Sequence, residues 1–141
     1  MYVRRLLPGD AREVLRAAPL FDHPPDPQAV TRYLADDRNV FLLALEADIP
    51  VGFLRGTELL QLTSSRRQMF LYEVAVAEAH RRRGVGAKLV GELLHYCTTH
   101  GFDEVFVFTD DPANDAAERL YRSTGAVTET RGDRMYDYKI P

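Results

Sequence analysis

An acidic residue and a basic, glycine-bearing loop lie close together near the middle of this 141-residue chain. Glu73 belongs to an apolar run over residues 70–76, and the sequence RRRGVG follows at residues 81–86. Glycines let a backbone approach a phosphate closely, and arginines add positive charge with fork-shaped donors. A helix that begins at such a loop adds unpaired N–H groups and the positive end of its dipole. The stretch therefore predicts a site for a phosphorylated ligand beside one carboxylate.

The loop also has a simpler interpretation. A helix start that contains glycine, preceded by a solvated run of arginines, would leave the same pattern. The dinucleotide fingerprint G-x-G-x-x-G is absent, and so is the lysine-containing P-loop. The loop alone does not distinguish a phosphate site from a plain helix start. The elements around the loop are needed to distinguish them.

Strands and helices that position these residues can be read along the chain. Asp10 is placed to cap the first predicted helix. The predicted strands cover residues 1–6, 40–45, 49–55, 70–76, 105–108, 126–130 and 135–140. The predicted helices cover residues 11–18, 27–34, 84–99 and 115–123, and residues 57–62 either extend a strand or begin a loop. Strand alternation predicts that Phe70, Tyr72, Val74 and Val76 face one way and Leu71, Glu73 and Ala75 the other.

This order of elements predicts one mixed α/β (α+β) domain over residues 1–141. The strands between residues 40 and 76 form a meander, which favours antiparallel pairing. The strand–helix–strand unit that follows requires a parallel pair with a right-handed crossover. The composition is 45% hydrophobic and 28% charged, which is ordinary for a globular protein.

Charge, cysteine content and the N-terminus exclude several classes of protein. A net charge of −3 argues against a nucleic-acid binder and leaves room for a cationic small substrate. Cys97 is the single cysteine, so no internal disulfide forms, and the four histidines lack metal-ligand spacing. No signal peptide or membrane-spanning run is recognisable. The expectation is a cytoplasmic protein that binds no metal, nucleic acid or membrane.

A second motif lies downstream of the loop and gives it a context. It consists of Asn114, Ala117, Leu120, Tyr121 and Gly125 on and after the last predicted helix. Together, the strand, the loop and this motif resemble the GNAT superfamily of acetyl-CoA-dependent N-acetyltransferases over residues 70–125. The resemblance implies a mostly antiparallel sheet of about six to seven strands, with about four helices and a central, splayed parallel strand pair.

The resemblance also implies where acetyl-CoA would bind. Coenzyme A would lie in a cleft between the strands at 70–77 and 104–109, with its pyrophosphate on the backbone of the loop and its pantetheine arm along the first strand. A backbone N–H near Val76 would stabilise the oxyanion. Asn114 would contact the cofactor arm, or would only cap its helix. The implied cofactor-binding residues are Val74, Ala75, Val76, Arg81, Arg82, Arg83, Gly84, Val85, Gly86, Ala87, Asn114, Ala117 and Tyr121.

Two side chains are candidates for proton transfer. An amine must lose a proton before it attacks a thioester, and Glu73 is the candidate general base. The alternative is a structural glutamate paired with an arginine or lysine across the sheet. Tyr121 is the candidate general acid for the departing thiolate, and its alternative is a core aromatic residue packed beside Leu120. Cys97 lies on the apolar face of its helix, which favours a buried structural thiol over an acetylated nucleophile.

A closer resemblance concerns the acceptor. The sequence YEVAV at 72–76, the turn HRR at 80–82 and the ending MYDYKI resemble the aminoglycoside 3-N-acetyltransferase branch, which commonly carries aspartate at the position of Glu73. The implied reaction is direct transfer in a ternary complex to a primary amine, such as an aminoglycoside. Candidate acceptor-binding residues are Asp110, Asp111 and Asp137.

Other functions remain open at this point. Alternative acceptors are a protein N-terminus, a lysine, a polyamine or a metabolite amine, and residues 21–27 and 57–68 would shape that choice. A non-catalytic acyl-CoA-binding domain would keep the loop but could dispense with Glu73 and Tyr121. A homodimeric interaction module would need no phosphate-binding loop, and the late strands are candidates to pair across a homodimer.

Overall fold

The computed structural model describes residues 1–109, 115–128 and 136–141. Its strands are β1 (Tyr2–Leu6), β2 (Asn39–Glu46), β3 (Ile49–Leu59), β4 (Gln68–Val76) and β5 (Glu104–Phe106). Its α-helices are α1 (Ala11–Arg16), α2 (Pro27–Ala35), α3 (Val85–Thr99) and α4 (Asp115–Ser123). Two short 3-10 helices, η1 (Ala18–Leu20) and η2 (Glu78–His80), complete the described elements.

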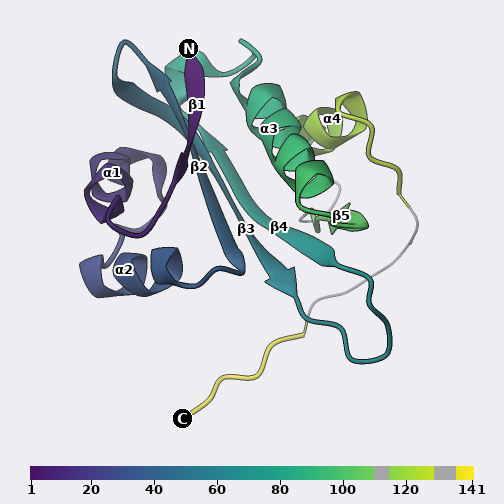
Figure 1. Ribbon diagram of the computed structural model, residues 1–141. Coiled ribbons are helices and arrows are strands. Elements are labelled where there is room, and N and C mark those ends of the chain that lie inside the picture. The colour runs from purple at the N-terminus through teal and green to yellow at the C-terminus, as the bar shows by residue number, and fades with distance from the viewer. Residues whose placement is uncertain (110–114, 129–135) are drawn as a thin grey trace.

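The five described strands form one sheet in chain order, β1-β2-β3-β4-β5. Every neighbouring pair is antiparallel except β4 and β5, which are parallel and joined through α3. Helices α1 and α2 cover one face of the sheet, and α3 and α4 lie on the other (Figure 1). The mixed sheet, the meander and the single parallel pair predicted from the sequence are therefore confirmed.

Each face of the sheet carries its own apolar core. Leu42, Leu54 and Leu89 belong to the core beneath α3, and Phe41 and Phe53 belong to the core beneath α1 and α2. The side chains of β2 alternate between these two buried faces, and for this reason its apolar run is unbroken. Cys97 is buried in the α3 core, and burial raises the pKa of its thiol to about 11. The prediction of a buried thiol is confirmed, and a thiol with a raised pKa is a poor nucleophile near neutral pH.

A β-bulge in β4 overturns the predicted facing of its side chains. Arg55 of β3 opposes Glu73, and the next residue of β3, Gly56, opposes Leu71, so Tyr72 is the extra residue. An extra residue reverses the inside–outside alternation of a strand. Leu71 and Val74 therefore both pack into the α3 core. Strict alternation predicted that Phe70 and Tyr72 share a face with Val74 and Val76. This prediction is wrong, because the bulge separates the two pairs.

Other elements differ from the sequence-based prediction at their ends. Helix α1 ends at Arg16, and the side chain of Asp10 does not cap its start, because the carboxylate accepts hydrogen bonds from Leu7 N and Arg4 instead. Residues 57–62 were predicted either to extend a strand or to begin a loop. Strand β3 includes the first three of them and ends at Leu59. Strand β5 ends at Phe106 instead of residue 108.

The two predicted closing strands are not seen where the structure describes them. Residues 126–128 and 136–140 are irregular, and residues 129–135 lie outside the described part of the chain. The alternating apolar residues of the last segment, Tyr136, Tyr138 and Ile140, are exposed. Six to seven strands were predicted, and the described residues contain five. None of the helices in the described ranges is long and apolar enough to cross a bilayer.

Gly52 sets the distance between β3 and the first turn of α3. A Cβ at Gly52 would lie 2.9 Å from Val85 Cγ1 and 3.0 Å from the carbonyl oxygen of Ala75. We expect Gly52→Ala to lower the free energy of unfolding by about 1–3 kcal/mol, because overpacking displaces the helix start. The measurement is urea denaturation followed by circular dichroism.

Gly91 provides the matched control within α3. Nothing lies within 4 Å of a Cβ built at Gly91, and alanine is the better helix former. Gly91→Ala should leave the stability unchanged or raise it by up to about 1 kcal/mol. Equal unfolding midpoints for Gly52→Ala and the wild type would show that α3 does not depend on this close approach.

Candidate functional site

Strand β4 pairs with β5 only over its first three residues. The parallel register runs from Gln68 opposite Glu104 to Phe70 opposite Phe106, where β5 ends. Strand β4 continues to Val76, and among the described residues no strand pairs with this part of its outer edge. The predicted splayed pair is therefore present, as an edge of β4 that begins after Phe70 and ends near the start of α3.

The backbone of this edge offers hydrogen-bonding groups. Ala77 N donates to Val51 O at 2.8 Å, which fixes the phase of the antiparallel β3–β4 ladder. Since hydrogen-bonded and non-hydrogen-bonded pairs alternate, the N–H and C=O groups of Val74 and Val76 point away from β3. They point toward the side that β5 has left, which is where the sequence predicts a pantetheine arm.

The loop between β4 and α3 has the geometry of an anion-binding turn. Arg82 has φ 61° and Gly84 has φ 82°, both in the left-handed region. A left-handed non-glycine residue costs about 1–2 kcal/mol, and such strain clusters at ligand sites. Left-handed residues in a turn let successive N–H groups converge on an anion.

The first turn of α3 adds free donors to this loop. Gly84 occupies the N-cap position without a side-chain cap, and the first helical hydrogen bond runs from Lys88 N to Gly84 O at 3.0 Å. The N–H groups of Val85, Gly86 and Ala87 therefore have no acceptor within the helix. Together with the positive dipole end, they fit the pyrophosphate of a coenzyme.

Side chains fasten the loop to the sheet at its start. Arg81 Nε donates to Val76 O at 3.3 Å, across the end of β4. His80 Nε2 lies 2.9 Å from Glu46 Oε2 at the end of β2. These contacts connect the loop to the last residues of two strands, so the N–H groups of the loop hold a fixed position relative to the unpaired edge.

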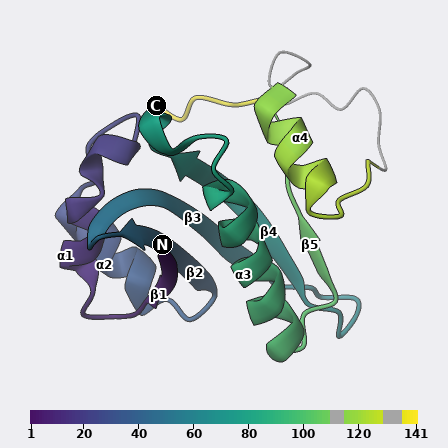
Figure 2. The same ribbon diagram turned by 90° about the horizontal axis from the view of Figure 1, so that it is seen from above.

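Helix α4 brings Tyr121 to the same end of the sheet. A Cβ at Gly86 would lie 3.1 Å from Leu120 Cδ2, so glycine there lets α4 approach the first turn of α3. Figure 2 shows α4 beside α3, over the side of the sheet that carries β5. Tyr121 is partly buried and packs on the α3 core, and this burial raises the pKa of its phenol. The contacts match the core-packing alternative, and the phenol keeps its proton, as the general-acid prediction requires.

Glu73 lies on the opposite face of the sheet from Tyr121. Val74 packs in the α3 core, so the neighbouring Glu73 points to the α1/α2 side. Its Oε2 accepts a hydrogen bond from Arg55 Nε at 2.7 Å. This is the cross-strand pair that the structural alternative for Glu73 predicts. The unpaired edge of β4 separates the candidate base from the candidate acid.

Of the remaining predicted residues outside β4 and the loop, the described structure includes only Ala117 and Asp137. Asp110, Asp111 and Asn114 lie outside the described residues, and Ala117 lies on α4. Asp137 is described, and it pairs with Lys139 at 2.6 Å in the exposed C-terminal segment. In the described part of the chain, no group of three or more acidic, histidine or cysteine side chains is arranged to hold a metal.

Arg55 is the site residue that the sequence analysis did not single out. The cross-strand alternative for Glu73 contained the signal, since it required an arginine or lysine on the neighbouring strand. Choosing among the basic residues needed the register of β3 against β4, and the bulge at Tyr72 shifts that register by one residue.

A hollow elsewhere on the described surface does not belong to this site. Val3, Arg5, Tyr96 and His100 are among the residues that line it. It lies between β1 and α3, at the other edge of the sheet from the parted strands β4 and β5.

Comparison with known proteins agrees with this geometry. The sequence model of the acetyltransferase (GNAT) family matches residues 9–126. An aminoglycoside acetyltransferase, meta-AAC0020, from an uncultured soil metagenomic sample was solved in complex with sisomicin. It is 27% identical, with a TM-score of 0.90, and the match covers 99% of this chain and 96% of that one. The aminoglycoside N-acetyltransferase AAC(6')-Iy, solved with CoA, shares the fold at 19% identity and a TM-score of 0.76, over 99% of this chain and 100% of that one.

A curated relative is an uncharacterized protein of Mycobacterium leprae (strain TN), 39% identical over 107 residues. The match covers 74% of this chain and 27% of that protein, so the chain spans about a quarter of that relative's length. The family match covers most of the chain and includes β4, the loop, α3 and α4. The chain belongs to the acetyltransferase (GNAT) family.

Proposed function

We propose that this acetyltransferase moves the acetyl group of acetyl-CoA directly to a primary amine, with aminoglycosides as the acceptor class. One observation carries the proposal. The unpaired edge of β4 turns the backbone groups of Val74 and Val76 outward and leads to the uncapped first turn of α3. An extended arm that ends in a pyrophosphate fits such an edge and such a helix start.

The cofactor would be held mainly by backbone. The N–H groups of Val85, Gly86 and Ala87 and the strained turn at Arg82 would bind the pyrophosphate. Strand β4 would pair with the pantetheine arm through Val74 and Val76. Acetyl-CoA supplies the activated acetyl group, and the chain's own residues orient it and move protons.

Proton transfer would take place from both faces of the sheet. Glu73 accepts the proton that the amine must lose, and Val76 N–H donates to the developing oxyanion. The bond between the amine nitrogen and the acetyl carbon forms as the carbon–sulfur bond breaks. Tyr121 donates its phenolic proton to the departing sulfur, and exchange with solvent then removes the proton from Glu73 and restores the one on Tyr121.

The choice of acceptor rests on likeness to the metagenomic enzyme that was solved with sisomicin, and on the acidic net charge of −3. Sisomicin is an aminoglycoside, and a cationic acceptor is favoured by an acidic protein. The alternatives are a polyamine, a metabolite amine, a lysine and a protein N-terminus. A non-catalytic acyl-CoA-binding domain is less well supported, because both Glu73 and Tyr121 are present.

The first test is an acceptor panel. Thiol release from acetyl-CoA is measured with aminoglycosides, polyamines, amino acid amides and peptides with free N-termini, each with the same enzyme preparation. We expect the highest kcat/KM with an aminoglycoside, and mass spectrometry should show one added acetyl group. A preference for any other class would contradict the aminoglycoside proposal, and no thiol release with the whole panel would contradict the proposed transfer.

Tyr121→Phe tests the general acid. We expect kcat to fall by about 10²-fold or more, because general acid catalysis typically contributes at least this much. Burial raises the pKa of the Tyr121 phenol above its ordinary value, so in the wild type the acid should stay protonated and cause no loss of activity through mildly alkaline pH. The measurement is kcat for thiol release as a function of pH, from mildly acidic to mildly alkaline buffers.

Tyr96→Phe is the matched control for the loss of a phenol. Tyr96 lies on α3 and packs against Phe102, His100 and the guanidinium of Arg5 on β1. This variant should keep the wild-type kcat. Undiminished thiol release by Tyr121→Phe would leave Tyr121 with a packing role alone.

A further inference from the structure

Glu73 is held from one side by a basic residue. The bulge at Tyr72 brings Glu73 opposite Arg55, and Arg55 Nε donates to Glu73 Oε2 at 2.7 Å. Among the described residues, the second carboxylate oxygen, Oε1, has no hydrogen-bond partner. The side chains of Arg55 and Glu73 are 31% and 29% exposed, so an acceptor can reach that oxygen.

Two aromatic rings fix the guanidinium of Arg55. Its Cζ lies 4.2 Å from the centre of the Tyr72 ring and 5.9 Å from that of Tyr33. The Tyr33 hydroxyl lies 2.8 Å from Gly56 O and 3.0 Å from Val40 O, which ties α2 to strands β2 and β3. A guanidinium stacked in this way loses little freedom when it binds a carboxylate.

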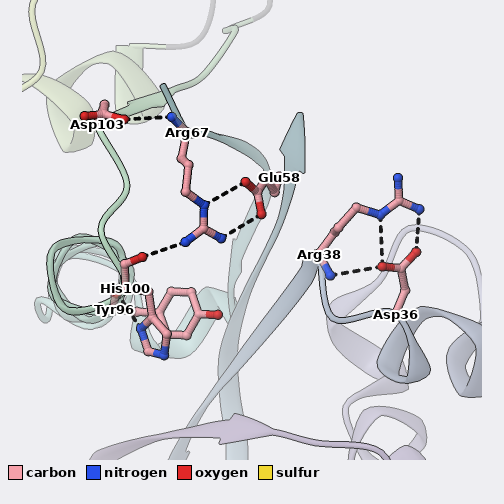
Figure 3. Close-up of polar contacts among 7 residues, drawn as sticks. All are labelled: Asp36, Arg38, Glu58, Arg67, Tyr96, His100 and Asp103. Atoms are coloured by element: carbon pink, nitrogen blue, oxygen red, sulfur yellow. Dashed lines mark hydrogen bonds and ion pairs between the residues drawn. The ribbon is translucent and has the colours of Figure 1, made fainter. Parts of the chain in front are cut away.

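A second arginine–glutamate pair, at the other end of the β3–β4 ladder, shows a different geometry (Figure 3). Arg67, just before β4, donates to both oxygens of Glu58, at 2.9 and 2.8 Å, and also to His100 O at 2.6 Å. Its Cζ lies 4.1 Å from the centre of the Phe102 ring. Both carboxylate oxygens of Glu58 are thus occupied, as suits a structural link between β3, the start of β4 and the end of α3.

The contrast between the two pairs suggests a function for the first. Arg55 occupies one oxygen of Glu73 and leaves the other open, which orients the carboxylate without saturating it. We propose that Arg55 is a positioning residue, which holds Glu73 so that Oε1 faces the acceptor amine. This inference rests on the proposed function, in which Glu73 is the general base.

The test is a double-mutant cycle on thiol release, with the best acceptor of the panel. Arg55→Ala should lower kcat by about 10- to 100-fold, since misplacing a catalytic group by about 1 Å has this effect. The KM for acetyl-CoA should stay unchanged, because Arg55 lies on the α1/α2 face. Arg55→Lys should recover part of the loss. In a Glu73→Gln background, Arg55→Ala should lower kcat by less than about twofold.

Arg67→Ala is the matched control, because it also breaks a stacked cross-strand pair. It should lower the melting temperature at least as much as Arg55→Ala but keep the wild-type kcat. A wild-type kcat in Arg55→Ala, or an equal loss in the Glu73→Gln background, would overturn the positioning role alone. Full activity of Glu73→Gln would overturn the proposed base, and the role of Arg55 with it.

Discussion

Backbone hydrogen-bonding groups that lose their strand partner constrain this structure more than any side chain does. A polar backbone group must find a partner in protein, water or ligand. Strand β5 leaves β4 after Phe106, while β4 continues to Val76. Within the described residues, the outward groups of Val74, the outward N–H of Val76 and the uncapped N–H groups of α3 form one line of groups without a strand or helix partner, while Arg81 Nε donates to Val76 O. The proposed binding of coenzyme A follows from that line.

Close packing keeps this line of backbone groups in place. Gly52 has no side chain, so the first turn of α3 can pack closely on the sheet. Gly86 in the same way lets α4 pack closely on that turn. The bulge at Tyr72 turns Glu73 to the far face of β4 and toward Arg55. The candidate base and acid therefore lie on opposite faces of the sheet, as the proposed reaction requires, because the amine would approach the acetyl carbon from one side and the sulfur would depart on the other.

Local patterns predicted much of this arrangement, and non-local register accounts for most of what they missed. The RRRGVG loop, the apolar helix face and the glycine after it predicted a helix over residues 84–99, and α3 spans Val85–Thr99. The facing of Phe70 and Tyr72 was wrong because a bulge depends on the pairing of two strands. Asp10 was predicted as a cap, but Leu7 N and Arg4 compete for its carboxylate. For Glu73, the structural alternative predicted an arginine or lysine across the sheet as its partner, but it did not identify that partner as Arg55.

Hydrogen exchange of individual backbone amides, followed by NMR with and without acetyl-CoA, tests the central claim most directly. At about 100 times the dissociation constant, we predict that the amides of Val74, Val76, Val85, Gly86 and Ala87 exchange up to about a hundredfold more slowly. Amides beside the hollow between β1 and α3, such as those of Val3 and Tyr96, should gain less protection. Unchanged exchange along β4 and the first turn of α3, or protection centred on that hollow, would contradict the account.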